Sequence, residues 1–142
     1  MPLQWRKQMS VGNLIIDQDH RYLLCLVNLV EFALHHPEER DHLKGALEQL
    51  AEYTREHFAR EERIQYAIRY PHYIDHKMAH QKLFGRLEEL AERILAEEAA
   101  SIVQDNAAEI TQLLRDWLLD HVLKEDMLMK QHLQPHPPNF LG

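Results

Sequence analysis

The sequence predicts an all-α fold: an antiparallel up-down-up-down four-helix bundle with an N-terminal arm and a short C-terminal tail. Three observations predict it. Apolar residues recur at spacings of three and four along four long stretches, as in helices that bury one face. Only 4 Gly and 6 Pro occur in 142 residues, so few positions break a helix. The connections between the stretches are short, so consecutive helices should lie side by side and antiparallel.

We expect one domain over 1–142, with an arm at 1–16, the bundle at 17–131 and a tail at 132–142. In the arm, Trp5 should cover one end of the core. Asp17 can cap a first helix that runs to about His36.

The second helix is expected from about Arg40 to Tyr70, where the following Pro71 ends it. The third should run from about Tyr73 to Glu98. A connection at 99–105 follows, in which Ser101 could cap the fourth helix, and that helix should end near Lys130.

Composition narrows the possible partners and location. The net charge of −7 and the isoelectric point near 5.8 argue against a basic nucleic-acid-binding face. The single cysteine, Cys25, cannot form an internal disulfide, which suits a reducing compartment, and we expect it in the core of the first helix. The most apolar segment, 23–34, is too short to span a bilayer. The sequence therefore predicts a cytoplasmic protein with neither a membrane nor a nucleic acid as partner.

Histidines and carboxylates occupy the stripes that should face inward. Residues four apart on a helix differ by about 40° in direction, so His57 shares a face with Glu61. A lone buried histidine is usually a hydrogen-bonded core residue, and a lone pair of histidines four apart is often a coincidence. Here ligand types recur at compatible heights on all four helices, which indicates a pair of metal ions. The expected ligands are His20, His57, Glu61, His76, His80, His121 and Asp126.

The fourth helix leaves an alternative open. His121 and Glu125 have the ideal spacing of four, whereas Asp126 is five residues from His121 and about 140° away in a regular helix. Spacing alone favours Glu125. A single π-type turn would instead bring Asp126 into the site.

The ligand set suggests which metal is bound. Two bridging carboxylates and a solvent-derived bridge leave six outer positions on two octahedral ions, and five histidines fill all but one. Imidazole with carboxylate suits iron best among redox metals, with zinc and manganese as alternatives. So few anionic ligands favour reversible O₂ binding over cleavage of the O–O bond.

Five motifs in order resemble the hemerythrins, and in particular the single-domain bacterial members, over nearly the whole chain. The matching segments are Ile16-Asp17-Gln18-Asp19-His20, His57-Phe58-Ala59-Arg60-Glu61-Glu62, Tyr70-Pro71, His76-Lys77-Met78-Ala79-His80 and Trp117-Leu118-Leu119-Asp120-His121 with Asp126. This resemblance implies two non-haem iron ions joined by an oxo or hydroxo bridge. It decides for Asp126 over Glu125 and implies that Glu61 and Asp126 bridge the irons.

The resemblance also implies the remaining roles. The terminal ligands of one iron would be His76, His80 and His121, and those of the other His20 and His57. The second iron would keep the position open to O₂, beneath an apolar lid formed by Leu118. The implied function is oxygen storage, transport or delivery without enzymatic turnover.

Two other functions remain alternatives. The same iron pair could act as an enzyme on peroxide, nitrite or NO, or as an oxygen or redox sensor read by a partner in trans. Gln65, one turn after Glu61, stands where bacterial members usually carry Met. If it faces the cavity, it could hydrogen-bond bound O₂ or admit water. NO and other small diatomics or anions are further candidate ligands of the iron pair.

Overall fold

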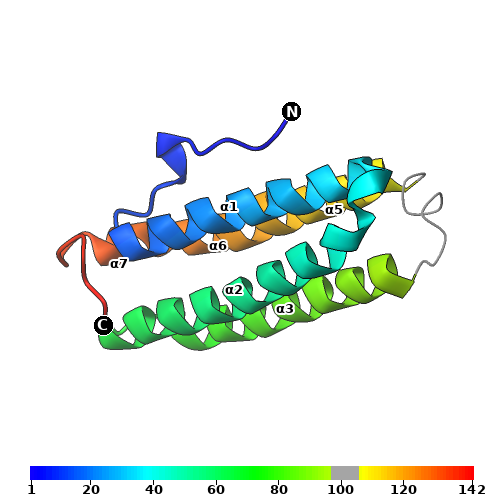
Figure 1. The fold of residues 1–142 in the computed structure, drawn as a ribbon. Helices are drawn as coiled ribbons and strands as arrows, with labels where there is room; N and C mark the ends of the chain where they lie inside the picture. Colours follow the sequence, from blue (N-terminus) through cyan, green and yellow to red (C-terminus); the bar gives the residue numbers. More distant parts are fainter. Residues whose placement is uncertain (97–105) are drawn as a thin grey trace.

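The described residues, 1–96 and 106–142, form a bundle of long antiparallel helices in a computed structural model (Figure 1). Short 3-10 turns, η1 (Lys7–Met9) and η2 (Pro37–Glu39), lie in the arm and after the first helix. The bundle consists of α1 (Leu14–His35), α2 (Arg40–Ala67), α3 (Tyr73–Ala96) and a fourth rod made of α5 (Ala107–Arg115), the π-helical η3 (Asp116–Leu123), α6 (Lys124–Met127) and α7 (Lys130–Leu133). No strand occurs among these residues.

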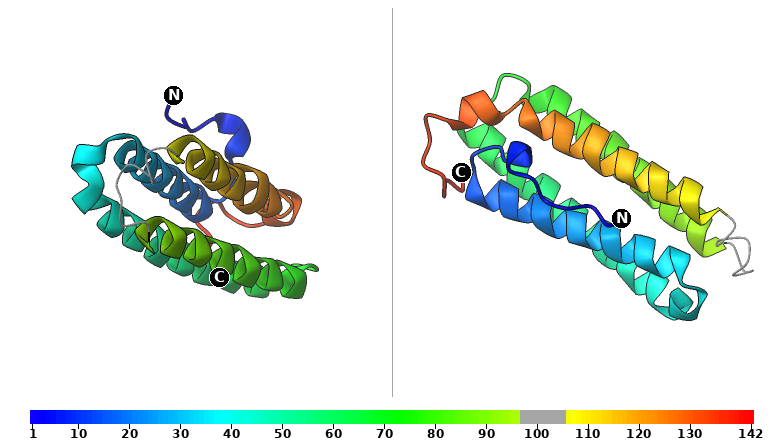
Figure 2. Two further views of the ribbon diagram at one scale, coloured as in Figure 1. Left: turned by 90° about the vertical axis from the view of Figure 1, so that its right-hand side faces the viewer. Right: turned by 90° about the horizontal axis from the view of Figure 1, so that it is seen from above.

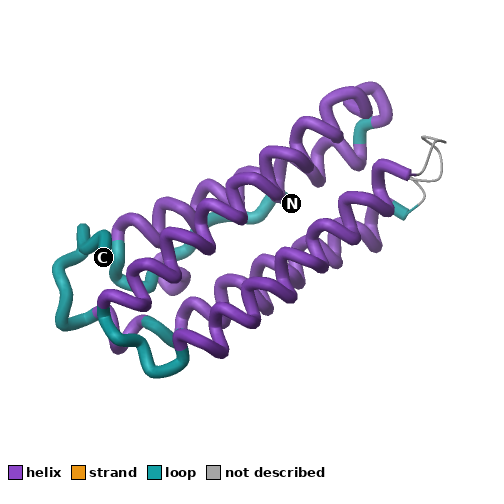
Figure 3. Tube along the Cα trace, turned by 90° about the horizontal axis from the view of Figure 1, so that it is seen from below, coloured by secondary structure: helices purple, strands orange, loops and turns teal. Residues whose placement is uncertain are grey.

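Each rod packs against two others and runs opposite to its neighbours in sequence (Figures 2 and 3). α1 contacts α2 and α5, and α3 contacts α2 and η3. The predicted all-α four-helix bundle is thus confirmed. The expected connection at 99–105 and the proposed cap at Ser101 lie outside the described residues.

The first helix begins earlier than expected because Asn13, not Asp17, is its cap. The Asn13 Oδ1 atom accepts hydrogen bonds from the backbone N–H groups of Ile15 and Ile16, both at 3.0 Å. Its Nδ2 atom donates to the carbonyl of Phe140 at 2.9 Å, which ties the tail to the start of the bundle. Asp17 instead lies inside the first turn, where its carboxylate accepts from the backbone N–H of Val11 at 2.8 Å.

Two other expectations for the first forty residues are wrong. Cys25 is exposed, because it lies about 200° around the helix from both Leu23 and Val27, which face the core. Trp5 does not cover an end of the core. It is half-buried beside α1, with the Arg21 guanidinium carbon 5.0 Å from its ring centroid.

The buried interior has two apolar parts with a polar layer between them. The larger part fills most of the bundle. The smaller part closes the end where α1 begins and the C-terminal tail lies, and consists of Val11, Ile16, Ile64, Tyr70, Met129 and Leu133. Along α1 the buried order is Ile16, His20, Leu23, so His20 falls between the two parts. On α2 and in the fourth rod, too, the candidate ligands lie between buried residues of the two parts, so the polar layer has one level along the bundle.

None of the described helices combines the length and the apolarity that crossing a bilayer needs.

Replacing the helix cap should destabilise the bundle. Asn13→Ala leaves two backbone N–H groups of the first turn without an acceptor and frees the Phe140 carbonyl. We expect a loss of about 1–2 kcal/mol in the free energy of unfolding, measured by urea denaturation. The control is Asn139→Ala, because Asn139 is exposed in the tail. If both variants are equally stable, Asn13 is not the cap that the structure indicates.

Candidate metal centre

Six of the seven expected ligands converge in the polar layer. They form two overlapping groups whose ligand atoms all lie within 4.8 Å of one another. One group is His20, His57, Glu61 and Asp126, and the other is Glu61, His76, His80 and Asp126. All six side chains are buried, with exposed fractions of 3% or less. Two groups that share both carboxylates have the arrangement that a pair of neighbouring cations requires.

Each shared carboxylate turns one oxygen toward each pair of histidines. Asp126 Oδ2 is 2.7 Å from His20 Nε2, and Asp126 Oδ1 is 2.9 Å from His76 Nε2. Glu61 Oε2 is 3.2 Å from His57 Nε2, whereas Glu61 Oε1 is 2.7 Å from His76 Nε2. The fourth imidazole, that of His80, lies 3.2 Å from Glu61 Oε1 through its Nε2. Carboxylates placed in this way can bridge two ions.

Helical spacing explains why these side chains meet. His57 and Glu61 are four residues apart on α2, and His76 and His80 are four apart on α3, so each pair shares one face of its helix. Asp126 lies in α6, three residues after the end of η3. The fourth rod thus contains π-helical geometry, over eight residues that begin before His121 and end at Leu123. Asp126 is buried in the cluster, whereas Glu125 is only half-buried.

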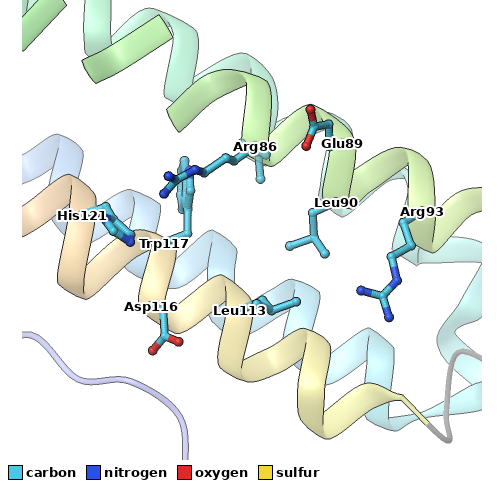
Figure 4. A pocket seen from close by; sticks show the side chains of 9 residues that line it. Arg86, Glu89, Leu90, Arg93, Leu113, Asp116, Trp117 and His121 are labelled. Carbon is cyan, nitrogen blue, oxygen red and sulfur yellow. The ribbon is translucent and has the colours of Figure 1, made fainter. Parts of the chain in front are cut away.

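His121 is the exception among the expected ligands. Its side chain is exposed and lines a surface pocket of about 410 Å³ between α3 and the fourth rod, beside Trp117 (Figure 4). The structure therefore leaves His121 outside the cluster that the other six residues form. The phase of η3 is the reason: Leu118, Val122 and Asp126 are buried at intervals of four residues, and His121 falls one residue outside that stripe.

The candidate ligands fit cations because their buried polar atoms and charges are not fully compensated by the protein alone. Glu61 Oε2 is buried and makes no well-aligned hydrogen bond, although His57 Nε2 lies 3.2 Å away, and His20 Nδ1 has no partner among the described residues. Burying two carboxylates side by side is unfavourable unless positive charge compensates them. Four imidazole Nε2 atoms directed at four carboxylate oxygens are ligands that iron, zinc and manganese accept.

In the metal-free protein, protons provide part of that compensation. Burial alone would lower the pKa of His76, but hydrogen bonds to Asp126 and Glu61 raise this pKa from 6.5 to about 10. Burial alone would raise the pKa of the Asp126 carboxyl. Hydrogen bonds from three histidines instead hold this pKa well below its ordinary value. Metal binding must displace the protons on the Nε2 atoms, since only neutral imidazole is a ligand.

Asp19 orients one of the candidate ligands, and sequence reasoning missed it. This buried carboxylate accepts a hydrogen bond from His57 Nδ1 at 3.0 Å and from Tyr53 Oη at 2.6 Å. Arg60 donates to both of its oxygens at 2.8 Å. Burial would raise the pKa of Asp19, but these donors lower it below its ordinary value. A charged partner on Nδ1 leaves Nε2 of His57 facing the cluster.

The signal for this network was present in the sequence. Tyr53 and Arg60 lie four residues before and three residues after His57, on the same side of α2. A similar carboxylate serves the second histidine pair, because Glu62 Oε2 lies 3.1 Å from His80 Nδ1.

Leu118, the expected lid, is completely buried, and its neighbour Trp117 donates through Nε1 to the carbonyl of Leu83 at 2.8 Å.

Comparison with known proteins identifies the family. The family model described as the hemerythrin HHE cation binding domain matches residues 11–133. The chain belongs to the hemerythrin family. All six converging residues lie inside the matched segment.

Three relatives show how far the likeness extends along the chain. A bacteriohemerythrin of Stenotrophomonas maltophilia is 27% identical over 138 residues, which cover 97% of this chain and 86% of the relative. One from Methylococcus capsulatus is 31% identical over 115 residues, covering 79% and 81%. A hemerythrin-like protein of Naegleria gruberi is 24% identical over 129 residues, covering 91% and 92%. The likeness therefore extends along nearly the whole chain.

Removing the charge of Asp19 should weaken metal binding. Asp19→Asn keeps the shape of the side chain but no longer holds the His57 ring with a full charge, so we expect the affinity for ferrous iron to fall by about 10- to 100-fold. Competition with a chromogenic chelator measures it. Asp120→Asn is the matched control because Asp120 is exposed. Equal affinities in the two variants would show that Asp19 does not orient the ligand.

The metal-free protein should lose stability at alkaline pH. A histidine whose pKa is raised on folding stabilises the folded state most below its ordinary pKa, which is 6.5 for His76. This contribution disappears as the pH rises toward the folded-state pKa of about 10. Urea denaturation of the metal-free protein should therefore give a lower free energy of unfolding at about pH 9.5 than at about pH 6. The difference should shrink in His76→Gln. Equal stability at both pH values would contradict the proton arrangement.

Proposed function

We propose that the protein binds O₂ reversibly at a non-haem di-iron centre and serves to store, transport or deliver oxygen. The observation that carries the proposal is the pair of carboxylates shared between two groups of histidines. Membership of a cation-binding family and the names of its bacteriohemerythrin relatives support it.

Six side chains would hold the metals. His20 and His57 would serve one ion, His76 and His80 the other, and Glu61 with Asp126 would bridge them. When bound, a ferrous pair supplies the two electrons that one O₂ molecule can accept and return. A seventh ligand from His121 would require η3 to turn its exposed face inward, so His121 is outside the proposed set.

The surroundings of the cluster suit binding without turnover. The nearest layers above and below it are apolar clusters, and Leu118 and Val122 are 0% and 1% exposed on the side of the larger one. Such walls exclude water, which would otherwise promote loss of the bound ligand and oxidation of the metals. Asp19 and Glu62 hold the rings of His57 and His80 in place through their Nδ1 atoms. Leu118 would be the apolar lid over the ligand.

Anaerobic reconstitution tests this function. The protein should take up two ferrous ions per chain, remain colourless, gain a visible charge-transfer band in air and lose that band under vacuum. His80→Ala should reduce the iron content, because it removes a ligand and leaves buried carboxylates less compensated. His42→Ala is the matched control, because His42 is exposed at the start of α2. A protein that binds zinc alone, or that bleaches irreversibly in air, contradicts the proposal.

His121→Ala tests the composition of the ligand set in the same assay. The geometry predicts that this variant retains both irons, as His42→Ala does. Iron loss equal to that of His80→Ala would show instead that η3 rotates on loading and that seven residues bind the pair.

A further inference from the structure

The outward face of α1 carries an uninterrupted line of exposed, uncharged side chains. Tyr22, Leu29 and Phe32 are 48%, 47% and 51% exposed, and Cys25 is exposed between them. At about 100° per residue, these four residues, the α1 stripe, point into one sector of about 80°. Every other residue of α1 between Tyr22 and Phe32 is buried or half-buried. Single exposed apolar residues are common, but a contiguous exposed apolar surface indicates an interaction site.

The N-terminal arm runs along α1 without covering the α1 stripe (Figure 2). The arm contacts the helix at two other residues. The side chain of Asn28 exchanges two hydrogen bonds of 2.8 Å with the backbone of Leu3. The guanidinium carbon of Arg21 lies 5.0 Å from the ring centroid of Trp5. Because the arm is held at these positions, the stripe remains exposed to a partner.

Contacts within the chain hold both aromatic rings of the stripe in place. The ring centroid of Tyr22 lies 4.3 Å from that of Tyr53 on α2. Phe32 stacks on His36, with 4.0 Å between the centroids and 20° between the ring planes. Side chains that are already ordered lose little conformational entropy when a partner covers them. The stripe therefore offers two preformed aromatic anchors, one near each of its ends.

The spacing of the stripe is that of a coiled-coil seam. One polar residue continues the stripe at each end, Gln18 and His36, so that successive members are 4, 3, 4, 3 and 4 residues apart. Alternating intervals of three and four are those of the positions where one helix packs along another in a heptad repeat. The opposite side of α1, with Leu23, Val27 and Val30, is already buried inside the bundle. The outward seam can therefore accept a further helix.

The residue types along this seam follow the same order from either end. A polar residue is followed by an aromatic ring and a smaller apolar side chain, and then the order reverses: Gln18, Tyr22, Cys25, Leu29, Phe32 and His36. A two-fold axis at the level of Val27 would set Tyr22 against Phe32 of a second copy, and Cys25 against its Leu29. A symmetric dimer requires such self-complementarity, whereas contact with a different protein does not. Antiparallel packing also sets the partial positive end of each helix beside the partial negative end of the other, which is favourable.

We propose that two copies of this chain form a symmetric dimer in which their α1 stripes pack antiparallel. The seam contains no Asp, Glu, Lys or Arg, so the contact brings no like charges together in a chain of net charge −7. His20 lies about 160° around α1 from Tyr22, so the candidate metal cluster faces away from the contact. The contact is small, which makes the dimer weak and dependent on concentration. This inference does not rest on the proposed di-iron function.

Sedimentation velocity over a series of protein concentrations tests the dimer. The parent should change from monomer to dimer as the concentration rises. Leu29→Glu places a charge in the middle of the seam, where burial without a partner is unfavourable, so the dissociation constant of the dimer should rise at least about tenfold. The melting temperature in dilute solution should stay at the parent's value. Leu113→Glu is the matched control, because Leu113 is 41% exposed on α5, and it should dimerise as the parent does.

Three outcomes of this experiment overturn the inference. A parent that stays monomeric at every concentration does so, and leaves the stripe to a partner of another kind. A dimer that Leu29→Glu does not weaken forms through a different surface. Equal weakening by Leu29→Glu and Leu113→Glu shows an effect of added charge rather than of the stripe. None of these outcomes bears on the proposed O₂ binding, which is measured separately on the iron-loaded protein.

Disulfide formation tests the antiparallel register. In the proposed dimer the two native Cys25 residues are offset by four residues, or about 6 Å along the helix axis, which together with the separation of the helices exceeds the reach of a disulfide. Leu29→Cys sets a second thiol opposite Cys25 of the other copy. This variant should form a covalent dimer on mild oxidation, whereas the parent and Leu113→Cys should form little. A parent that cross-links through Cys25 as readily as Leu29→Cys contradicts the antiparallel arrangement.

Discussion

Two carboxylates shared between two pairs of imidazoles are the arrangement on which the rest of the structure depends. Glu61 and Asp126 are buried side by side, and their mutual repulsion is tolerable only where positive charge lies between them and the histidines. Protons supply that charge in the metal-free chain, as the raised pKa of His76 indicates. Metal ions would supply it more completely. The four rods must therefore stay in register along the bundle axis. A shift of any rod by one helical turn would leave a buried charge without compensation.

The fold maintains this register through contacts around the site. Asn13 caps the first helix and binds the tail, and Asp17 binds the backbone of Val11, so the last part of the arm and the tail close the bundle at the start of α1. The two apolar clusters then enclose the polar layer from both sides. Asp19 and Glu62 fix two imidazole rings from outside. Side chains whose orientation is determined in advance bind a metal with little reorganisation, which is the advantage of building the site on rigid helices.

Periodicity was sufficient to predict the bundle and most of the cluster, because residues four apart on a helix share a face whatever the rest of the chain does. It did not predict features that depend on the exact rotation of a residue around its helix axis or on contacts between helices. The extent of the π-helical segment decides which residues of the fourth rod face inward, and it excludes His121 while admitting Asp126. Asp19 acts across helices, on His57, Tyr53 and Arg60, so no local spacing on its own helix reveals it. Cys25 lies within an apolar run and yet faces outward, since position around the helix outweighs composition.

Two metal ions should lie between Glu61 and Asp126, each with one pair of histidines. Anomalous diffraction at the iron edge, from crystals of anaerobically loaded protein, tests it most directly. We expect two neighbouring iron peaks, one beside His20 and His57 and the other beside His76 and His80. A single peak, or iron bound only at exposed histidines such as His42, would contradict it.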